Sequence, residues 1–224
     1  KYGVGSRHLP ATVALCDPEL TVTLPPELTA STGMDALGHA LECYVNRVTQ
    51  PLSESLAIRA LEMIARSLRA AVVWGQNIEA RSEMLLASTM AAMAFNPTRL
   101  GIAHALAMPL GARHGIPHSV IISLLLPDVC DYNLIGALDK FAHIARLFGE
   151  PVEGISLREA AERGARAVHR LRHDLPLPEG LSAYGVEDKH LRSLAEEGIE
   201  SGNIPVNPRS PTVEDLMEIM RRAL

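Results

Sequence analysis

The chain has 224 residues, of which 47% are hydrophobic, 21% charged and 4% aromatic, and its formal net charge is −5. This length allows one large domain or two small ones, and the negative charge without a basic stripe excludes a typical nucleic-acid-binding protein. The longest apolar run, residues 120–127, is too short for a membrane span, and three cysteines without CxxC spacing favour a reducing cytoplasm over a disulfide-bonded secreted protein.

The first elements are a predicted strand and a short helix. Residues 11–16 form an apolar segment that predicts a buried strand, and a lone strand needs a sheet to pair with. The chain also opens at Lys1 rather than at methionine. We therefore expect residues 1–24 to be a remnant of, or linker from, an upstream domain. Pro25-Pro26 then starts a short helix, since proline is tolerated in a first helical turn.

Residues 25–224 are expected to form one helical domain. Helical patterns with glycine and proline between them occur at residues 32–47, 52–74, 78–95, 99–112, 117–131, 136–148, 156–173, 187–200 and 213–223. The proline- and glycine-containing loop at 175–185 is expected to separate the core from a C-terminal helical tail. The prediction is an all-α helical bundle with a short strand remnant at its N-terminus.

Four residues form a candidate metal site. Asp35 and His39 are four residues apart, which puts them on one face of a helix, and His104 and His118 follow downstream. One carboxylate and three imidazoles suit a divalent metal ion, whereas a closed structural zinc site more typically uses cysteine. Such an ion polarises an oxygen or lowers the pKa of a bound hydroxyl. The set therefore predicts a metal-dependent enzyme.

The remaining histidines are expected to be surface or satisfied core residues: His8, His143, His169, His173 and His190. His114 lies four residues before His118 and is a candidate to line the site. Gly115 and Pro117 lie between them, however, and a proline there disrupts a helix.

Several blocks of the sequence resemble the iron-containing (group III) alcohol dehydrogenases. They occur in family order as Asp17-Pro18-Glu19-Leu20, Leu24-Pro25-Pro26, residues 32–42, Ala94-Phe95-Asn96, residues 100–105, Pro109-Leu110-Gly111, residues 115–118, and Leu126-Pro127 with Asn133. The resemblance implies the all-helical, metal-binding C-terminal domain of a two-domain, dehydroquinate synthase-like fold. In that family an α/β dinucleotide-binding domain lies upstream, and we expect it to be missing from this chain.

The resemblance also implies an activity and its residues. Asp35, His39, His104 and His118 would hold Fe²⁺ or Zn²⁺, Phe95 would lie beside the nicotinamide, and Lys1 would contact the cofactor. The reaction would be NAD- or NADP-dependent interconversion of an alcohol with an aldehyde or ketone by hydride transfer, with the metal polarising the substrate oxygen. A homodimer or larger homo-oligomer is implied, with a small-molecule alcohol or aldehyde as substrate and no nucleic-acid or membrane partner.

Two positions depart from the family pattern. Met108 stands where a second histidine commonly follows the first by four residues, and that histidine is credited with a role near the substrate or in proton transfer. We therefore advance His114 as the catalytic residue that replaces it. Ser119 stands where a glycine usually follows the last ligand.

Three alternatives stay open. The metal-free maleylacetate reductase type typically has asparagine at the place of Asp35. A helical HD-type phosphohydrolase would use His173-Asp174, but that dipeptide lies beside a proline-rich loop, far from the other histidines. The third is a metal-binding fragment that is inactive without its cofactor domain.

Overall fold

The computed structural model describes residues 8–9 and 11–224, so the proposed cofactor residue Lys1 lies outside the described residues. Within this part of the chain every regular element is a helix, which confirms the expected all-α fold. The α-helices are α1 Pro26–Val45, α2 Pro51–Val73, α3 Ile78–Phe95, α4 Ile102–His114, α5 His118–Asn133, α6 Leu138–Leu147, α7 Leu157–His173, α8 Asp188–Gly198 and α9 Val213–Arg222. Short 3-10 helices lie at the connections: η1 Pro18–Thr21, η2 Leu134–Gly136, η3 Leu181–Tyr184 and η4 Ile204–Val206.

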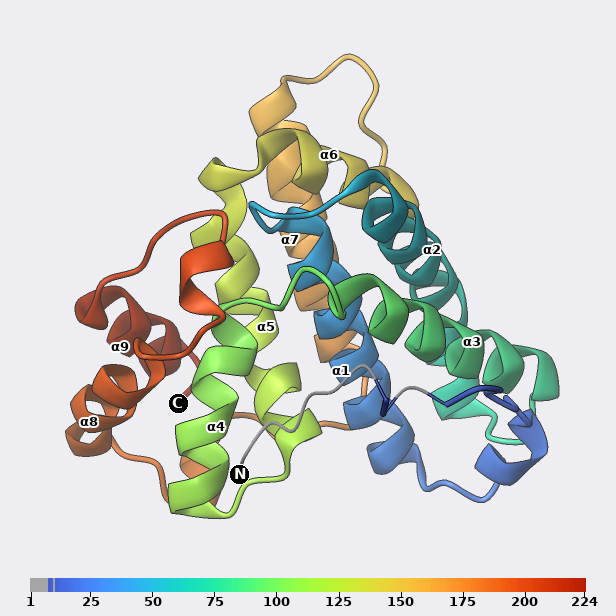
Figure 1. Cartoon of the computed structure of the whole chain (residues 1–224), viewed down its shortest axis with the longest axis horizontal. Helices are drawn as coiled ribbons and strands as arrows, with labels where there is room; N and C mark the ends of the chain where they lie inside the picture. The colour runs from blue at the N-terminus through green and yellow to red at the C-terminus, as the bar shows by residue number, and fades with distance from the viewer. Residues whose placement is uncertain (1–7, 10) are drawn as a thin grey trace.

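Helix α1 lies at the centre of the molecule (Figure 1). It packs against α2 and α3 on one side and against α5 on the other. Helix α4 lies along α5, and α8 and α9 flank that pair at the outer edge. Helices α6 and α7 pack on each other, with α6 at one end of the bundle, and α7 runs from there behind α1 and packs against α5. The central helix is therefore in contact with neighbours that come from distant parts of the sequence.

Two glycines allow α1 to approach its neighbours closely. Gly33 lies against Leu68 of α2, and a Cβ at Gly38 would come within 2.7 Å of Ile122 Cγ2 on α5. Glycine in a helix interior costs roughly 0.5–1 kcal/mol relative to alanine. Its presence at both contacts fits a helix whose position is set by close packing, and Asp35 and His39 lie on this same helix.

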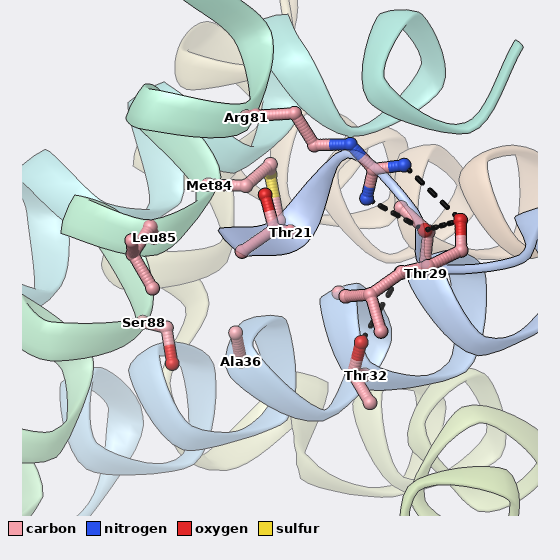
Figure 2. Close-up of a pocket in the computed structure, with 10 residues that line it drawn as sticks. Thr21, Thr29, Thr32, Ala36, Arg81, Met84, Leu85 and Ser88 are labelled. Carbon is pink, nitrogen blue, oxygen red and sulfur yellow. Dashed lines mark hydrogen bonds between the residues drawn. The ribbon is translucent and has the colours of Figure 1, made fainter. Parts of the chain in front are cut away.

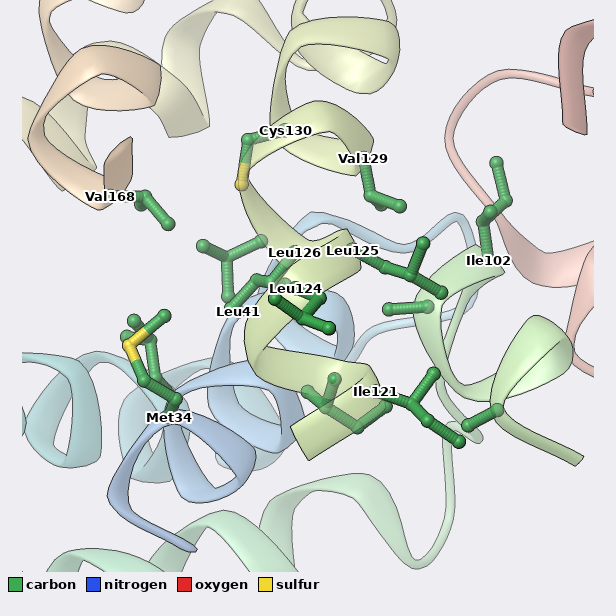
Figure 3. Packing of buried hydrophobic residues seen from close by; sticks show 14 of the residues in the cluster. Met34, Leu41, Ile102, Ile121, Leu124, Leu125, Leu126, Val129, Cys130 and Val168 are labelled. Carbon is green, nitrogen blue, oxygen red and sulfur yellow. The ribbon is translucent and has the colours of Figure 1, made fainter. Parts of the chain in front are cut away.

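Helix α5 forms much of the core. Figure 3 shows its apolar side chains beside Met34 and Leu41 of α1 and Val168 of α7. The stretch His118–Gly136 is long and apolar enough to cross a membrane by composition, yet 67% of it is buried inside the protein. Full burial of one large aliphatic side chain contributes about 1.5–3 kcal/mol to folding. The helix is therefore explained as a core helix of this bundle.

Two expectations for the N-terminal part are wrong. Residues 11–16 form no strand in the described part of the chain, because a strand needs ladder hydrogen bonds to a neighbour and none is available. Their side chains are not buried either, since Val13 is 79% and Leu15 is 90% exposed. The short helix at Pro25-Pro26 and the helix expected from residue 32 are one continuous element, α1, because no residue between them breaks the helix.

The C-terminal segment is part of the core rather than a separate tail. Helix α8 packs on α4, and α9 packs on α5. The backbone N–H of Leu181 donates to the carbonyl of Ala223 at 2.7 Å. Asn133 and Asn207, both buried, exchange hydrogen bonds of 3.1 and 2.6 Å between their side-chain amides. The loop at 175–185, which contains η3, therefore connects two parts of one packed unit.

Candidate metal centre

Three helices bring the four candidate ligands together. Asp35 and His39 lie on α1, His104 lies in the first turn of α4, and His118 is the first residue of α5. A single oxygen, Asp35 Oδ1, lies 3.8 Å from His39 Nε2, 3.6 Å from His104 Nε2 and 3.7 Å from His118 Nε2. The ligand atoms of the first three residues all lie within 4.8 Å of one another. Residues separated by up to 83 positions thus converge on one point.

The donor atoms fit a divalent cation. Asp35 Oδ1 and His104 Nε2 are shielded from solvent and have no hydrogen-bond partner. A buried polar atom without a partner is costly, and buried groups in folded proteins are normally satisfied. An ion bound tetrahedrally at about 2.0–2.2 Å would hold its ligands about 3.4 Å apart. The observed separations of 3.6 to 3.8 Å are close to that value.

Burial and the neighbouring charges give the two best-shielded imidazoles opposite pKa shifts. Burial, together with the nearby His104, lowers the pKa of His39 to about 4, so that ring is neutral at pH 7. Burial also disfavours the charged form of His104, but the neighbouring carboxylates of Asp35 and Glu42 outweigh it and raise the pKa of His104 to about 9. For Asp35 burial opposes ionisation, yet His104 and the other imidazoles lower the pKa below its usual value. A metal ion would therefore meet an ionised carboxylate and would displace a proton from His104.

Glu42 is a site residue that the sequence did not single out. Its carboxylate is 1% exposed and lies 2.7 Å from His104 Nδ1, on the side of the ring opposite Nε2. It also accepts the backbone N–H groups of Gly101 at 2.8 Å and Ala103 at 2.7 Å. The available signal was its spacing, since residue 42 lies two helical turns after Asp35 on the same face of α1.

Phe95 lies beside the candidate ligands. It is the last residue of α3, and its ring stacks on His39 with 4.8 Å between ring centroids. His39 in turn stacks on His104 at 4.7 Å. An apolar ring thus covers one side of the cluster, at the position where the family resemblance places the nicotinamide.

The structure does not bring His114 to this cluster. His114 is the last residue of α4, ten residues after His104, which corresponds to about 15 Å along a helix axis. Its ring instead packs against His190, with centroids 5.0 Å apart. Burial and His190 lower the pKa of His114.

A hollow of about 360 Å³ opens directly beside His118. Its walls are Ala107, Met108, Gly111, Ala112, Ile116 and His118. Met108 lies one helical turn after His104, so it occupies the place nearest to the ligands on this face of α4. The wall has no acidic or basic group besides His118, so it suits an uncharged molecule.

A second, smaller hollow of about 140 Å³ lies between η1, α1 and α3 (Figure 2). Arg81, 3% exposed, lines it and donates to Thr29 Oγ1 at 2.7 Å, to the Gly75 carbonyl at 3.0 Å and to the Leu24 carbonyl at 3.3 Å. These bonds use the guanidinium to join the segment before α1 to α3. We therefore interpret Arg81 as a structural clamp.

Comparisons with known proteins point to one family. The model of the Fe-containing alcohol dehydrogenase family, C-terminal, matches residues 29–224. The 1,3-propanediol dehydrogenase of Klebsiella pneumoniae is 42% identical over 98% of this chain and 57% of its own length. The NAD-dependent methanol dehydrogenase of Bacillus methanolicus is 40% identical over 100% of this chain and 59% of its own length. The chain thus spans little more than half the length of these curated relatives.

The fold gives the same result. The crystal structure of a 1,3-propanediol oxidoreductase superposes with a TM-score of 0.91 at 42% sequence identity, covering 93% of this chain and 55% of that one.

Proposed function

The chain belongs to the iron-containing alcohol dehydrogenase family, and from this premise we propose that it is the metal-binding part of an NAD(P)-linked alcohol dehydrogenase. Such an enzyme interconverts an alcohol with an aldehyde or ketone by hydride transfer. The observation that carries the proposal is the placement of Asp35 Oδ1 within 3.8 Å of three imidazole nitrogens, with no hydrogen bond to satisfy it.

The ion would be held by Asp35, His39, His104 and His118. The family favours Fe²⁺ as that ion, whereas divalent-metal affinity generally favours Zn²⁺ over Fe²⁺. When bound, the ion supplies Lewis acidity toward a substrate oxygen. The protein side chains position the site and determine from which side a substrate reaches it. The carboxylate and the imidazoles fix the position of the site, and the side chain of His104 is only 5% exposed. The His118 side chain is 29% exposed, so a substrate would approach from its side.

The hollow beside His118 supports a small, uncharged alcohol as substrate. Its walls are mainly Ala, Gly, Met and Ile side chains, which exclude bulky or charged groups by shape and desolvation. The names of the two relatives, 1,3-propanediol dehydrogenase and NAD-dependent methanol dehydrogenase, refer to small alcohols. Met108 has no exchangeable proton, so we expect a different group to exchange the hydroxyl proton of the substrate. His114 is still our prediction for that role although it lies at the far end of α4, and a His114→Ala variant with unchanged turnover would exclude it.

The nicotinamide would lie against Phe95, whose ring already covers the His39 side of the cluster. We propose residues 25–224 as the helical metal-binding domain and residues 1–24 as the connection to a cofactor-binding domain. Lys1, assigned to the cofactor by resemblance, belongs to that connection. The homodimeric state and the cytoplasmic location stay predictions.

The metal-free reductase and the inactive metal-binding fragment are the outcomes that compete with this proposal. A metal-free site would leave Asp35 Oδ1 and His104 Nε2 buried without partners. That cost favours the metal-dependent enzyme.

Metal content tests the proposal first. Elemental mass spectrometry of the purified, anaerobically handled chain should give about one equivalent of iron or zinc, since one complete donor set is present. His118→Ala should lose that metal because it removes a donor atom, and Asp35→Asn should lose it because a neutral amide replaces the charged carboxylate. His143→Ala is a matched control, since the His143 ring binds Tyr44 at 2.8 Å and not the cluster.

Two results would contradict the assignment. A full equivalent of metal in His118→Ala would exclude that residue as a ligand. Absence of metal from the wild-type chain after reconstitution with Fe²⁺ or Zn²⁺ would favour the metal-free reductase. Where the metal is present, NADH formation from short alcohols by the full-length enzyme then distinguishes the dehydrogenase from an inactive metal-binding protein.

A further inference from the structure

We infer that Glu42 is a positioning residue of the metal centre: its carboxylate fixes the ring of His104 so that Nε2 faces the other ligands. This inference rests on the proposed metal-dependent function. It assigns Glu42 no contact with the ion, because Glu42 binds the opposite edge of the ring.

The carboxylate of Glu42 has an unusual set of partners for a buried acid. It is 1% exposed, and within the described part of the chain no lysine or arginine forms an ion pair with it. Its partners are three N–H groups: His104 Nδ1 at 2.7 Å and Gly101 N at 2.8 Å on Oε2, and Ala103 N at 2.7 Å on Oε1. A buried carboxylate is tolerated only when hydrogen bonds replace its hydration. These three bonds therefore fix its place.

The same carboxylate holds the start of α4. The first N–H groups of a helix have no partner inside the helix, and negative charge is favourable there. Glu42 satisfies two such groups while it binds the side chain of His104, the third residue of α4. The backbone and the ring are thus fastened to one group on α1, and the ring cannot turn without breaking its bond to Glu42.

Gly101 makes room for this arrangement. A Cβ at Gly101 would come within 2.9 Å of Glu42 Oε1 and within 2.9 Å of Asn207 Oδ1. Only a residue without a side chain leaves the carboxylate in place. Gly101 therefore gives a second way to disturb Glu42 without removing its charge.

The third bond is what distinguishes positioning of a ligand from structural support. A clamp for the helix start would need only the two backbone N–H groups. The bond to Nδ1 leaves the opposite nitrogen, Nε2, buried without a partner and 3.6 Å from Asp35 Oδ1. Metal-bound histidines usually donate their second N–H to a carboxylate or carbonyl, and loss of that partner weakens metal affinity about 10–100-fold. We expect a loss of that size when Glu42 no longer accepts all three bonds.

The test compares Zn²⁺ dissociation constants, measured by chelator competition, and the visible absorption spectrum of the Co²⁺-loaded chain. Glu42→Gln keeps the side-chain volume but replaces one accepting carboxylate oxygen with an NH2 group, which can only donate. It should weaken Zn²⁺ binding about 10–100-fold and change the Co²⁺ spectrum, because the His104 ring reorients.

Two variants serve as matched controls. Asp131→Asn makes the same change from carboxylate to amide at a carboxylate–histidine contact, 3.0 Å from His169, away from the cluster. Asn46→Ala removes the side-chain bonds to the carbonyls of Thr98 and Arg99, which loosens the loop before α4 without touching His104. Both should bind Zn²⁺ within about threefold of the wild type.

The Zn²⁺ affinities of the variants decide whether Glu42 has the positioning role. Weaker Zn²⁺ binding by Glu42→Gln alone, with apo-chain unfolding close to that of Asn46→Ala, supports the positioning role. Equal affinity in Glu42→Gln and wild type overturns it, and so does an equal loss in Asn46→Ala. If Glu42→Gln does not fold, Gly101→Ala is measured instead, and an unchanged affinity in that variant overturns the inference. No Zn²⁺ binding by the wild-type chain would contradict the metal centre itself.

Discussion

Individual histidines in this protein take their properties from their surroundings more than from their own chemistry. His39 and His104 stack on each other, yet the pKa of one is lowered to about 4 and that of the other is raised to about 9. Burial acts on both rings and Asp35 lies close to both, and the difference is that His104 also binds the carboxylate of Glu42 at 2.7 Å. The position of the acids therefore decides which ring carries a proton before metal binds.

His169 gives a pH-dependent prediction away from the metal centre. Its hydrogen bond to Asp131 at 3.0 Å raises the pKa of His169 above the ordinary value of 6.5. The stabilisation is therefore fully present below pH 6.5 and is lost as the pH rises through the folded-state pKa. Because both side chains are 40% exposed, we expect less than about 1 kcal/mol.

Urea denaturation of the wild type and Asp131→Asn at pH 6 and at pH 9 measures this effect. The difference in the free energy of unfolding between the two proteins should be larger at pH 6, and contributions from other groups cancel in that difference. A difference that does not change with pH would show that the pair makes no charge-dependent contribution.

At the scale of single residues, part of the candidate site could be predicted from the sequence. The spacing of Asp35 and His39 predicts a shared helix face, and the two lie there. Glu42 could not be assigned a role in the same way, because its meaning depends on α4 reaching α1, a contact that no local pattern encodes. The same limit applies to His114, since its spacing from His118 carries no information on how the chain turns at Gly115.

At the scale of elements, close contacts between helices depend on which glycines have space around them. Gly38 and Gly111 both lie inside helices, α1 and α4. A Cβ at Gly38 would lie 2.7 Å from Ile122 Cγ2 and 3.5 Å from His104 Cε1, whereas at Gly111 the nearest atoms would lie 3.5 and 3.6 Å away. The first contact is a clash and the second is ordinary packing.

We therefore predict opposite effects for two identical substitutions. Gly38→Ala should lower the free energy of unfolding by about 1–3 kcal/mol, because it overpacks the contact between α1 and α5. Gly111→Ala should raise it by up to about 1 kcal/mol, because alanine favours the helix and meets no clash. Urea unfolding curves for the two variants test the pair, and a stabilised Gly38→Ala would contradict the packing argument.

Helix existence follows from the sequence better than helix limits do. Each range expected from residue 52 onwards overlaps an observed helix, because amphipathic spacing and caps such as Ser156 and Thr212 are local signals. The two N-terminal errors arise because a local sequence pattern lacks information about the rest of the chain. An apolar segment predicts a strand only if a partner strand exists, and consecutive prolines predict a helix start without telling where that helix ends.

For the whole molecule, the candidate metal centre joins three helices that lie far apart in the sequence. The candidate ligands come from α1, α4 and α5, and α8 and α9 pack against α4 and α5 from the outer side. The sequence could not predict that support, because the contact between α4 and α8 links segments about 90 residues apart with no shared pattern. A group that binds all three helices at once should stabilise the fold as a unit.

Metal binding is thus predicted to raise the stability of the entire chain. A ligand that binds only the folded state at 100 times its dissociation constant adds about 2.7 kcal/mol to the free energy of unfolding, and each kcal/mol shifts the melting temperature by about 2–4 °C in a protein of this size. Zn²⁺ or anaerobic Fe²⁺ should therefore raise the melting temperature by about 5–10 °C, and a chelator should reverse the shift.

Mg²⁺, which prefers oxygen ligands, should have little effect. Asp35→Asn should show no such shift, because a neutral amide replaces the charged carboxylate that all three imidazoles face. An equal shift in that variant would place the metal elsewhere in the molecule, since the four-residue cluster would then be dispensable for binding.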